Sequence, residues 1–202
     1  MIPTKSDIKR LLDKANQVPK NRSWVRHSYG VGTSAGKIAK AINAKDKIIP
    51  LDVEKITKLG LLHDIGKTFE PWVLHPLRGY HYLQELGYDD EYCRISLTHS
   101  FVNNDPYCMF SEFMQADRDR EVIEYIEQHE FTTEEKIVAL CDMMYGTEMW
   151  TLDKRIIDVI SRHGTGPKTV ERIHEVYRLK QHFDDLLGYN LYDLFPEIKK
   201  NL

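Results

Sequence analysis

Three titratable side chains follow a run of apolar residues in the stretch LGLLHDIGK, which spans Leu59 to Lys67. His63 and Asp64 are neighbours, about 100° apart around a helix, so one helix end can offer an imidazole and a carboxylate to the same cation. The second oxygen of Asp64 can also bridge to another ion. Charged groups at a buried helix end are costly unless they are paired or bound to a cation. The stretch therefore indicates a metal site.

Four more residues of metal-binding type fall on or beside the inward faces of other expected helices, namely His27, His75, His99 and Asp142. A lone histidine on an apolar face is more often a hydrogen-bonded core residue than a ligand. A carboxylate inside the apolar run KIVALCDMM is harder to accommodate, because an unpaired buried charge costs several kcal/mol. A shared cation accounts for all of these residues together. The hypothesis is that one metal is held by His27, His63, Asp64 and Asp142, and a second by Asp64, His75 and His99.

Helical periodicity and capping signals recur along almost the whole chain. The expected helices span residues 6–15, 23–43, 52–63, 76–86, 89–100, 119–129, 133–145, 152–162 and 167–187. Ser6 and Asp52 are the expected N-caps of the first and third helices, and Gly66 is the expected stop of the third. Residues 101–117 combine turn residues and aromatics without a clear period, which predicts a long loop or lid. Because β-branched residues never gather into alternating runs, the expected class is all-α.

The composition is that of an ordinary soluble globular protein, with 202 residues, 42% hydrophobic residues, 29% charged residues and a formal net charge of −3. We expect a single domain over residues 1–202, with a core at about 22–146 and C-terminal helices at 147–202 that pack on it. The mixed charges do not favour duplex nucleic acid, and no apolar run approaches the roughly 18 residues of a membrane helix. We therefore expect a cytoplasmic protein without a membrane partner.

The three cysteines, Cys93, Cys108 and Cys141, are widely spaced and form no CxxC pair. They are expected to be reduced residues and not zinc ligands. The aromatic C-terminal segment YNLYDLFPEIKKNL is expected to pack on the bundle or on another subunit, so a homo-oligomer stays open.

The order of the ligand types, H…HD…D, resembles the signature of the HD-domain superfamily of metal-dependent phosphohydrolases. The matching segments are VRHSYGVG at His27, LLHDIGK at His63 and Asp64, and IVALCDMM at Asp142, so the resemblance covers roughly residues 24–144. It implies a helical bundle with a metal site at its centre. In the family's HDxxK pattern the lysine lies near substrate phosphate, which here corresponds to Lys67.

Two further segments extend the resemblance to family members that hold two metals. HPLRGYHYL from His75 is similar to their HPxxGA-type segment, notably that of the symmetrical dinucleoside-polyphosphate hydrolases, and LTHSF at His99 is similar to their next ligand. By that similarity His75 and His99 are second-metal ligands. The tandem histidine of some members is His99 followed by Ser100 here, and the GYP element of cyclic-di-GMP phosphodiesterases is absent.

These observations lead us to expect a metal-dependent phosphohydrolase that cleaves a phosphomonoester, phosphodiester or phosphoanhydride, with a nucleotide as the small phosphorylated substrate. Divalent ions would generate a hydroxide from water, and Asp64 would orient it. Lys67 is expected to act in catalysis and substrate binding, and Arg78, three residues after His75, to clamp phosphate. A histidine and carboxylate set suits one or two ions of iron, manganese, cobalt, nickel or zinc.

Two alternatives stay open at this point. Some proteins of the same fold use a histidine-rich di-iron pair as an oxygenase, and the same ligands would serve that chemistry. The other alternative is a non-catalytic module, in which a metal stabilises the bundle and the protein binds a nucleotide.

Overall fold

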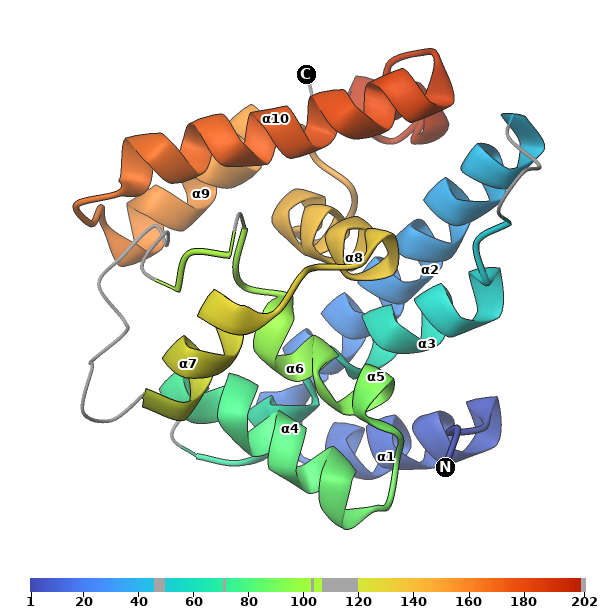
Figure 1. Ribbon diagram of the computed structural model, residues 1–202, viewed down its shortest axis with the longest axis vertical. Helices are drawn as coiled ribbons and strands as arrows, with labels where there is room; N and C mark the ends of the chain where they lie inside the picture. The colour runs from blue at the N-terminus through green and yellow to red at the C-terminus, as the bar shows by residue number, and fades with distance from the viewer. Residues whose placement is uncertain (46–49, 71, 103, 107–119, 201–202) are drawn as a thin grey trace.

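The computed structural model describes residues 1–45, 50–70, 72–102, 104–106 and 120–200 (Figure 1). Within these residues all regular structure is helical, apart from an isolated antiparallel bridge between Tyr145 and Met149. The prediction of an all-α fold is therefore confirmed. The α-helices are α1 (Lys5–Asn16), α2 (Arg22–Lys45), α3 (Val53–Leu62), α4 (His75–Glu85), α5 (Asp90–Cys93), α6 (Ile95–Thr98), α7 (Arg120–Gln128), α8 (Thr133–Met144), α9 (Leu152–His163) and α10 (Thr169–Leu187).

Helix starts follow the capping chemistry of the sequence, with one correction. Asp52 caps α3 by accepting a hydrogen bond from the Lys55 amide, as expected. The cap of α1 is Thr4 and not Ser6, because Thr4 and Asp7 complete a reciprocal capping box. Ser6 lies inside the helix instead.

The expected helix over residues 89–100 is divided into the short helices α5 and α6. Arg94 lies at the junction, where the Leu97 amide bonds to its carbonyl three residues back and tightens the turn. Its guanidinium bonds to Asp90 and to Glu135 at the start of α8, so a tertiary contact shapes this turn. Periodicity alone could not predict that interruption. Most of the expected lid, residues 107–119, and with it Cys108, lies outside the described residues.

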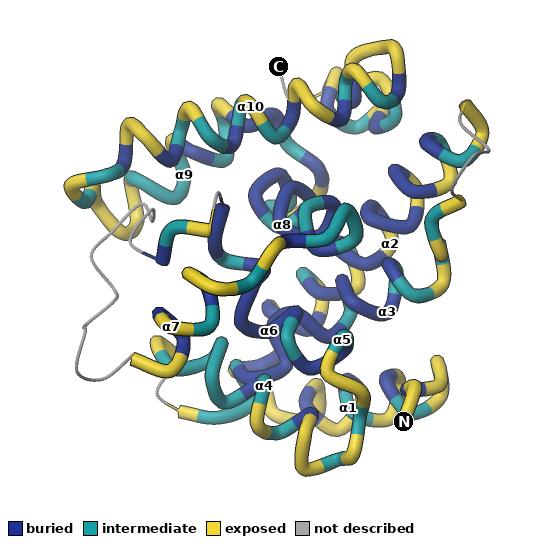
Figure 2. Tube along the Cα trace, viewed as in Figure 1, coloured by how far each residue is buried: buried dark blue, intermediate teal, exposed yellow. Residues whose placement is uncertain are grey.

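The centre of the bundle is formed by α2, α3 and α8, which are largely buried (dark blue) where they face one another in Figure 2. The axes of α2 and α3 come very close at two glycines. A Cβ on Gly60 would lie 2.6 Å from the Gly32 Cα, so neither position has room for a larger residue. This close crossing fixes the spacing between the middle of α2 and the end of α3.

The C-terminal helices α9 and α10 pack against α8 and lie along one end of the molecule (Figure 1). Buried residues of the last segment, including Leu191, Phe195 and Ile198, join the same hydrophobic core as α2 and α3. The aromatic C-terminus therefore packs on the bundle. Of the described cysteines, Cys93 and Cys141 are buried and free.

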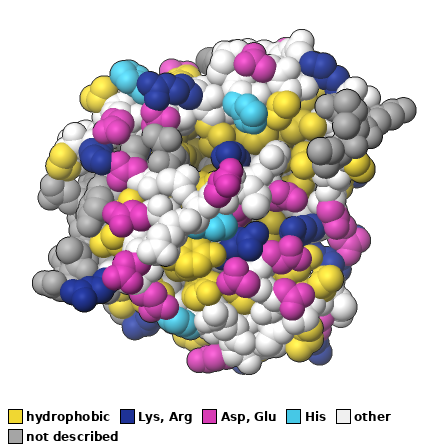
Figure 3. Space-filling view, viewed as in Figure 1, with side chains coloured by type: hydrophobic (Ala, Val, Ile, Leu, Met, Phe, Trp, Pro, Cys, Tyr) yellow, Lys and Arg dark blue, Asp and Glu magenta, His cyan; other side chains and the backbone are white. Residues whose placement is uncertain are grey.

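Acidic and basic side chains are interspersed on the face seen in Figure 3. Among the described residues, no helix combines the length and the apolar character that are needed to cross a membrane.

A 3₁₀ turn, η2 (Ile65–Thr68), follows α3 and lies directly against the start of α4. Gly66 is at the contact, and its φ is not positive, so it does not act as a left-handed helix stop. A Cβ on Gly66 would lie 1.9 Å from the His75 carbonyl oxygen and 2.6 Å from the Gly79 amide nitrogen. Glycine is required here because backbone meets backbone.

We predict that Gly66→Ala lowers the free energy of unfolding by about 2 kcal/mol or more, because backbone atoms of α4 must move to admit the methyl group. Urea unfolding of the metal-free protein measures this change. Thr33→Ala, on the exposed side of α2, is the control and should change stability by less than about 0.5 kcal/mol. Equal stability of Gly66→Ala and wild type would contradict the backbone contact.

Candidate metal centre

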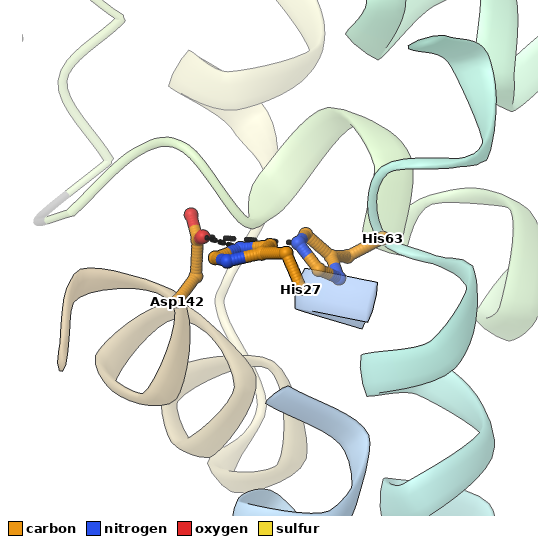
Figure 4. Close-up of side chains that lie close together, drawn as sticks. All are labelled: His27, His63 and Asp142. Atoms are coloured by element: carbon orange, nitrogen blue, oxygen red, sulfur yellow. Dashed lines mark hydrogen bonds and ion pairs between the residues drawn. The ribbon is translucent and has the colours of Figure 1, made fainter. Parts of the chain in front are cut away.

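The structure brings all of the sequence-predicted metal ligands together in two adjoining clusters. Ligand atoms of His27, His63 and Asp142 lie within 4.8 Å of one another, and those of Asp64, His75 and His99 do the same. Figure 4 shows the first cluster, in which the side chains from α2, the end of α3 and α8 point toward one another. The imidazoles form a continuous row, with adjacent ring centroids 5.0–5.3 Å apart.

Asp64 lies between the two clusters and presents a different oxygen to each. Its Oδ1 is 3.4 Å from His75 Nε2 and 3.6 Å from His99 Nε2. Its Oδ2 is 3.5 Å from His63 Nε2, which belongs to the other cluster. The side chain is 1% exposed, and the residue has φ −100° and ψ 10°, in the sparsely populated bridge region. This is the geometry of a carboxylate that can bridge two ions.

Backbone carbonyls hold three of the imidazoles in one tautomer. The Nδ1–H groups of His63, His75 and His99 donate to the carbonyls of Gly60, Trp72 and Ile95, at 2.7, 2.8 and 3.0 Å. A carbonyl oxygen only accepts, so each Nδ1 carries the proton and each Nε2 keeps its lone pair. All three Nε2 atoms face the clusters, as metal-ligating histidines require.

The unsatisfied atoms at the centre fit a cation. His63 Nε2 and Asp64 Oδ1 are buried without a hydrogen-bond partner, which is costly for polar atoms. The lone pairs of His75 Nε2 and His99 Nε2 face each other at 3.3 Å, and no proton lies between them in the tautomer set by the backbone. The Ser100 hydroxyl, 2.9 Å from His99 Nε2, satisfies only one of these atoms. A bound divalent ion would satisfy all of them.

His27 is held differently, because its Nε2 bonds to Asp142 Oδ1 at 2.7 Å. Oδ1 of Asp142 is also 3.7 Å from His63 Nε2. A cation bound by both residues would replace the proton that His27 and Asp142 share.

Electrostatics keep the carboxylates charged. Burial opposes ionisation of Asp64, but the charge of Lys67 and the contact with His63 hold its pKa well below the usual value. For Asp142, burial is likewise outweighed by the hydrogen bond from His27, so its pKa is lowered.

The imidazoles of the second cluster are neutral. Burial and then the charge of Lys67 lower the pKa of His75 to about 3. Burial and the neighbouring His63 lower the pKa of His99 to about 4. Ionised carboxylates and neutral imidazoles are the protonation states in which these groups bind metal.

A cavity of about 680 Å³ opens onto both clusters. Lys67 lines it, and its Nζ bonds to Asp64 Oδ2 at 2.6 Å. α3 ends at Leu62, close to the expected end at His63, and Lys67 lies in the 3₁₀ turn η2 that follows. Arg78, the other predicted substrate residue, does not line this cavity. His75 is the first residue of α4 and Arg78 lies one turn further along the helix, so a shared helix face did not bring the arginine to the opening.

Sequence reasoning missed several residues of the cavity wall. Arg155 and Arg162 of α9 line it, as do all three tryptophans of the chain, Trp24, Trp72 and Trp150. The expected helix over 152–162 placed Arg155 and Arg162 on one helical face, but nothing in the sequence indicated that this face covers the metal centre.

We predict that the metal-free protein loses stability as the pH falls from about 6.5 to about 4.5. In this range the unfolded chain protonates His75 and His99, which have an ordinary pKa of 6.5, whereas the folded chain does not. Stability is therefore complete above pH 6.5 and declines below it. His99→Gln should flatten the decline, and urea midpoints between pH 7.5 and 4.5 measure it.

The control is His174→Gln, at an exposed position on α10, which should leave the pH dependence unchanged. Burial lowers the pKa of His63, but the neighbouring carboxylates Asp64 and Asp142 outweigh it and raise that pKa, which opposes part of the decline. The same slope in His99→Gln and wild type would contradict a neutral buried His99.

Comparison with known proteins agrees with this geometry. The chain is 30% identical to the uncharacterized protein MJ0778 of Methanocaldococcus jannaschii over 165 residues, which is 80% of this chain and 91% of that protein. No solved structure gave a significant match. The HD domain family matches residues 24–162, a range that contains every predicted ligand. The chain therefore belongs to the HD-domain superfamily of metal-dependent phosphohydrolases.

Proposed function

We propose that this protein is a phosphohydrolase with a two-metal centre and a nucleotide-type substrate. The observation that carries the proposal is the position of Asp64, which directs one carboxylate oxygen at each of two clusters of metal-binding side chains. A cavity bordered by cationic side chains adjoins the same atoms. Metal centre and anion-binding wall together suit phosphoester hydrolysis better than either would alone.

One ion would be held by His27, His63, Asp64 and Asp142, and the other by Asp64, His75 and His99. Divalent ions bound there supply Lewis-acid chemistry, lowering the pKa of water and neutralising charge on phosphoryl oxygens. The neutral nitrogen and charged oxygen donors fit iron, manganese, cobalt, nickel or zinc.

The chain's own groups would orient the reactants. Asp64 would position the attacking water by accepting a hydrogen bond from it, since the carboxylate lies at the junction of the clusters. Lys67 binds Asp64 through its Nζ and also faces the cavity, so it would move onto the substrate phosphate and stabilise the charge that develops in the transition state. The buried rear wall, where His63 and Asp64 are almost fully covered, would limit access of other water to the site.

The nucleotide part of the proposal is supported by the aromatic wall. Trp72 is 40% exposed and lines the cavity, as does Trp150, so flat apolar surface is available for a base. The HP segment at His75, similar to that of dinucleoside-polyphosphate hydrolases, supports the same substrate class.

We predict that metal-stripped protein reconstituted with manganese, iron, cobalt or nickel hydrolyses members of a nucleotide and phosphoester panel, and that Asp64→Ala lowers turnover by about 10²-fold or more. Released phosphate measures the reaction. Asp13→Ala, at an exposed ion pair on α1, is the matched control and should retain wild-type turnover. If no metal gives turnover above that of Asp64→Ala, the proposal fails. Iron-specific, oxygen-dependent turnover would identify the oxygenase alternative, and tight nucleotide binding without hydrolysis the non-catalytic one.

We predict that the two clusters lose metal separately. His99→Ala should reduce bound metal by about one ion per chain, because a ligand is removed from a centre with only three. Elemental analysis after dialysis measures the stoichiometry, with His174→Ala as the exposed histidine control. Unchanged metal content in both His75→Ala and His99→Ala would exclude the second ion and leave a one-metal phosphohydrolase.

A further inference from the structure

Helix α9 places two arginines and one aspartate on the wall of the metal-centre cavity. Arg155, Asp158 and Arg162 follow the i, i+3, i+7 spacing of a single helix face, and all three line the cavity. This helix comes after Asp142, the last predicted ligand in the sequence. None of its residues belongs to the two metal clusters. Its chemistry is therefore separate from metal binding.

The two guanidiniums share one carboxylate. Arg155 Nη1 bonds to Asp158 Oδ2 at 2.6 Å, while Arg162 bonds to the same residue through Nε at 3.1 Å and Nη2 at 2.5 Å. Asp158 thus neutralises only one of two positive charges, and it holds both guanidiniums at the cavity wall. Each guanidinium has five N–H donors, which is more than the single carboxylate can accept.

One N–H donor of Arg155 has no acceptor in the structure. Arg155 is mostly buried, with a side chain 16% exposed, and its Nε has no hydrogen-bond partner. A buried N–H on a charged group is costly to leave unpaired. A tetrahedral anion in the cavity would accept from more than one guanidinium N–H, in the paired geometry that arginine offers to phosphate.

The arginine face lines the same cavity as Lys67, which would bind the cleaved phosphate. Burial and then the charges of Arg162 and Arg155 lower the pKa of His163 at the end of α9, and Lys67 contributes in the same direction. The end of α9 and the lysine of η2 therefore lie within electrostatic reach across one cavity. Arg26 of α2 lines the cavity too.

We propose that Arg155 and Arg162 form an anion subsite that binds a phosphate group of the substrate other than the one that is hydrolysed. The subsite rests on the proposed function, because the metal centre is assigned to the cleaved phosphate. It specifies the substrate as a molecule with at least two phosphate groups. Asp158 pairs with both guanidiniums in the absence of substrate, so an incoming anion would compete with it for their N–H donors.

Binding of inorganic pyrophosphate to the metal-free protein tests the subsite without any turnover. All three tryptophans line the cavity, so intrinsic fluorescence can follow the titration. We expect wild type to bind pyrophosphate, and Arg155→Gln and Arg162→Gln each to raise its dissociation constant about tenfold or more. Asp158→Asn should lower the constant, because it removes the carboxylate that competes for the arginines.

Arg10→Gln is the matched control, since Arg10 also pairs with an aspartate three residues away but lies on α1. It should bind pyrophosphate like wild type. Arg162 is 50% exposed, so its substitution keeps the test decisive if Arg155→Gln does not fold. Wild-type affinity in Arg162→Gln, or an equal loss in Arg10→Gln, would overturn the subsite.

A kinetic experiment separates the subsite from the proposed function. With manganese-loaded enzyme, Arg162→Gln should lower kcat/KM for ATP at least about tenfold more than kcat/KM for p-nitrophenyl phosphate, which has a single phosphate. The loss should fall mainly on KM. Equal losses for both substrates would overturn the subsite and leave the phosphohydrolase intact. If wild type hydrolyses neither compound nor the wider panel, the proposed function fails, and pyrophosphate binding still decides the subsite.

Discussion

An ionised carboxylate at the centre of a helical bundle is the constraint on which the rest of this structure depends. Asp64 is almost fully buried, so its charge must be balanced by groups that the fold brings to it. Lys67 of η2 supplies one positive charge. Ring nitrogens of His63 and His75 lie near the two carboxylate oxygens. The close crossing of α2 and α3 and the glycine contact between η2 and α4 both bring these elements to the same point. Much of the packing near the site can be understood as support for one charged group.

The clustering of the candidate ligands could be predicted because some of them break a local rule and because the resemblance pointed to His75 and His99. Asp142 interrupts an apolar helical run, and His63 with Asp64 ends another, so polar groups at expected core positions indicated a shared partner. The all-α class could be predicted because helical periodicity recurs along almost the whole chain. Local signals also located most helices to within a few residues, as at α3 with its Asp52 cap.

What the sequence could not predict depends on tertiary contacts. The expected helix over 89–100 is interrupted at Arg94, whose side chain bonds to Glu135, far away in the chain. Arg78 shares a helix with His75 but does not reach the cavity, whereas Arg155 and Arg162 reach it from a helix with no ligand. Periodicity gives the face of a helix on which a residue lies, and only the packing of helices decides what that face covers. The clustering of the candidate ligands was therefore easier to predict than the cavity around them.

The opposed lone pairs of His75 and His99 have a consequence for the stability of the metal-free chain. Two buried nitrogens that face each other at 3.3 Å without a proton between them are a source of repulsion in the metal-free chain, and each has a depressed affinity for protons. An apolar pair at the same positions would fill the space without that repulsion. The metal-free protein thus keeps a local conflict in its core at a cost in stability, which is the kind of departure from good packing that functional sites show.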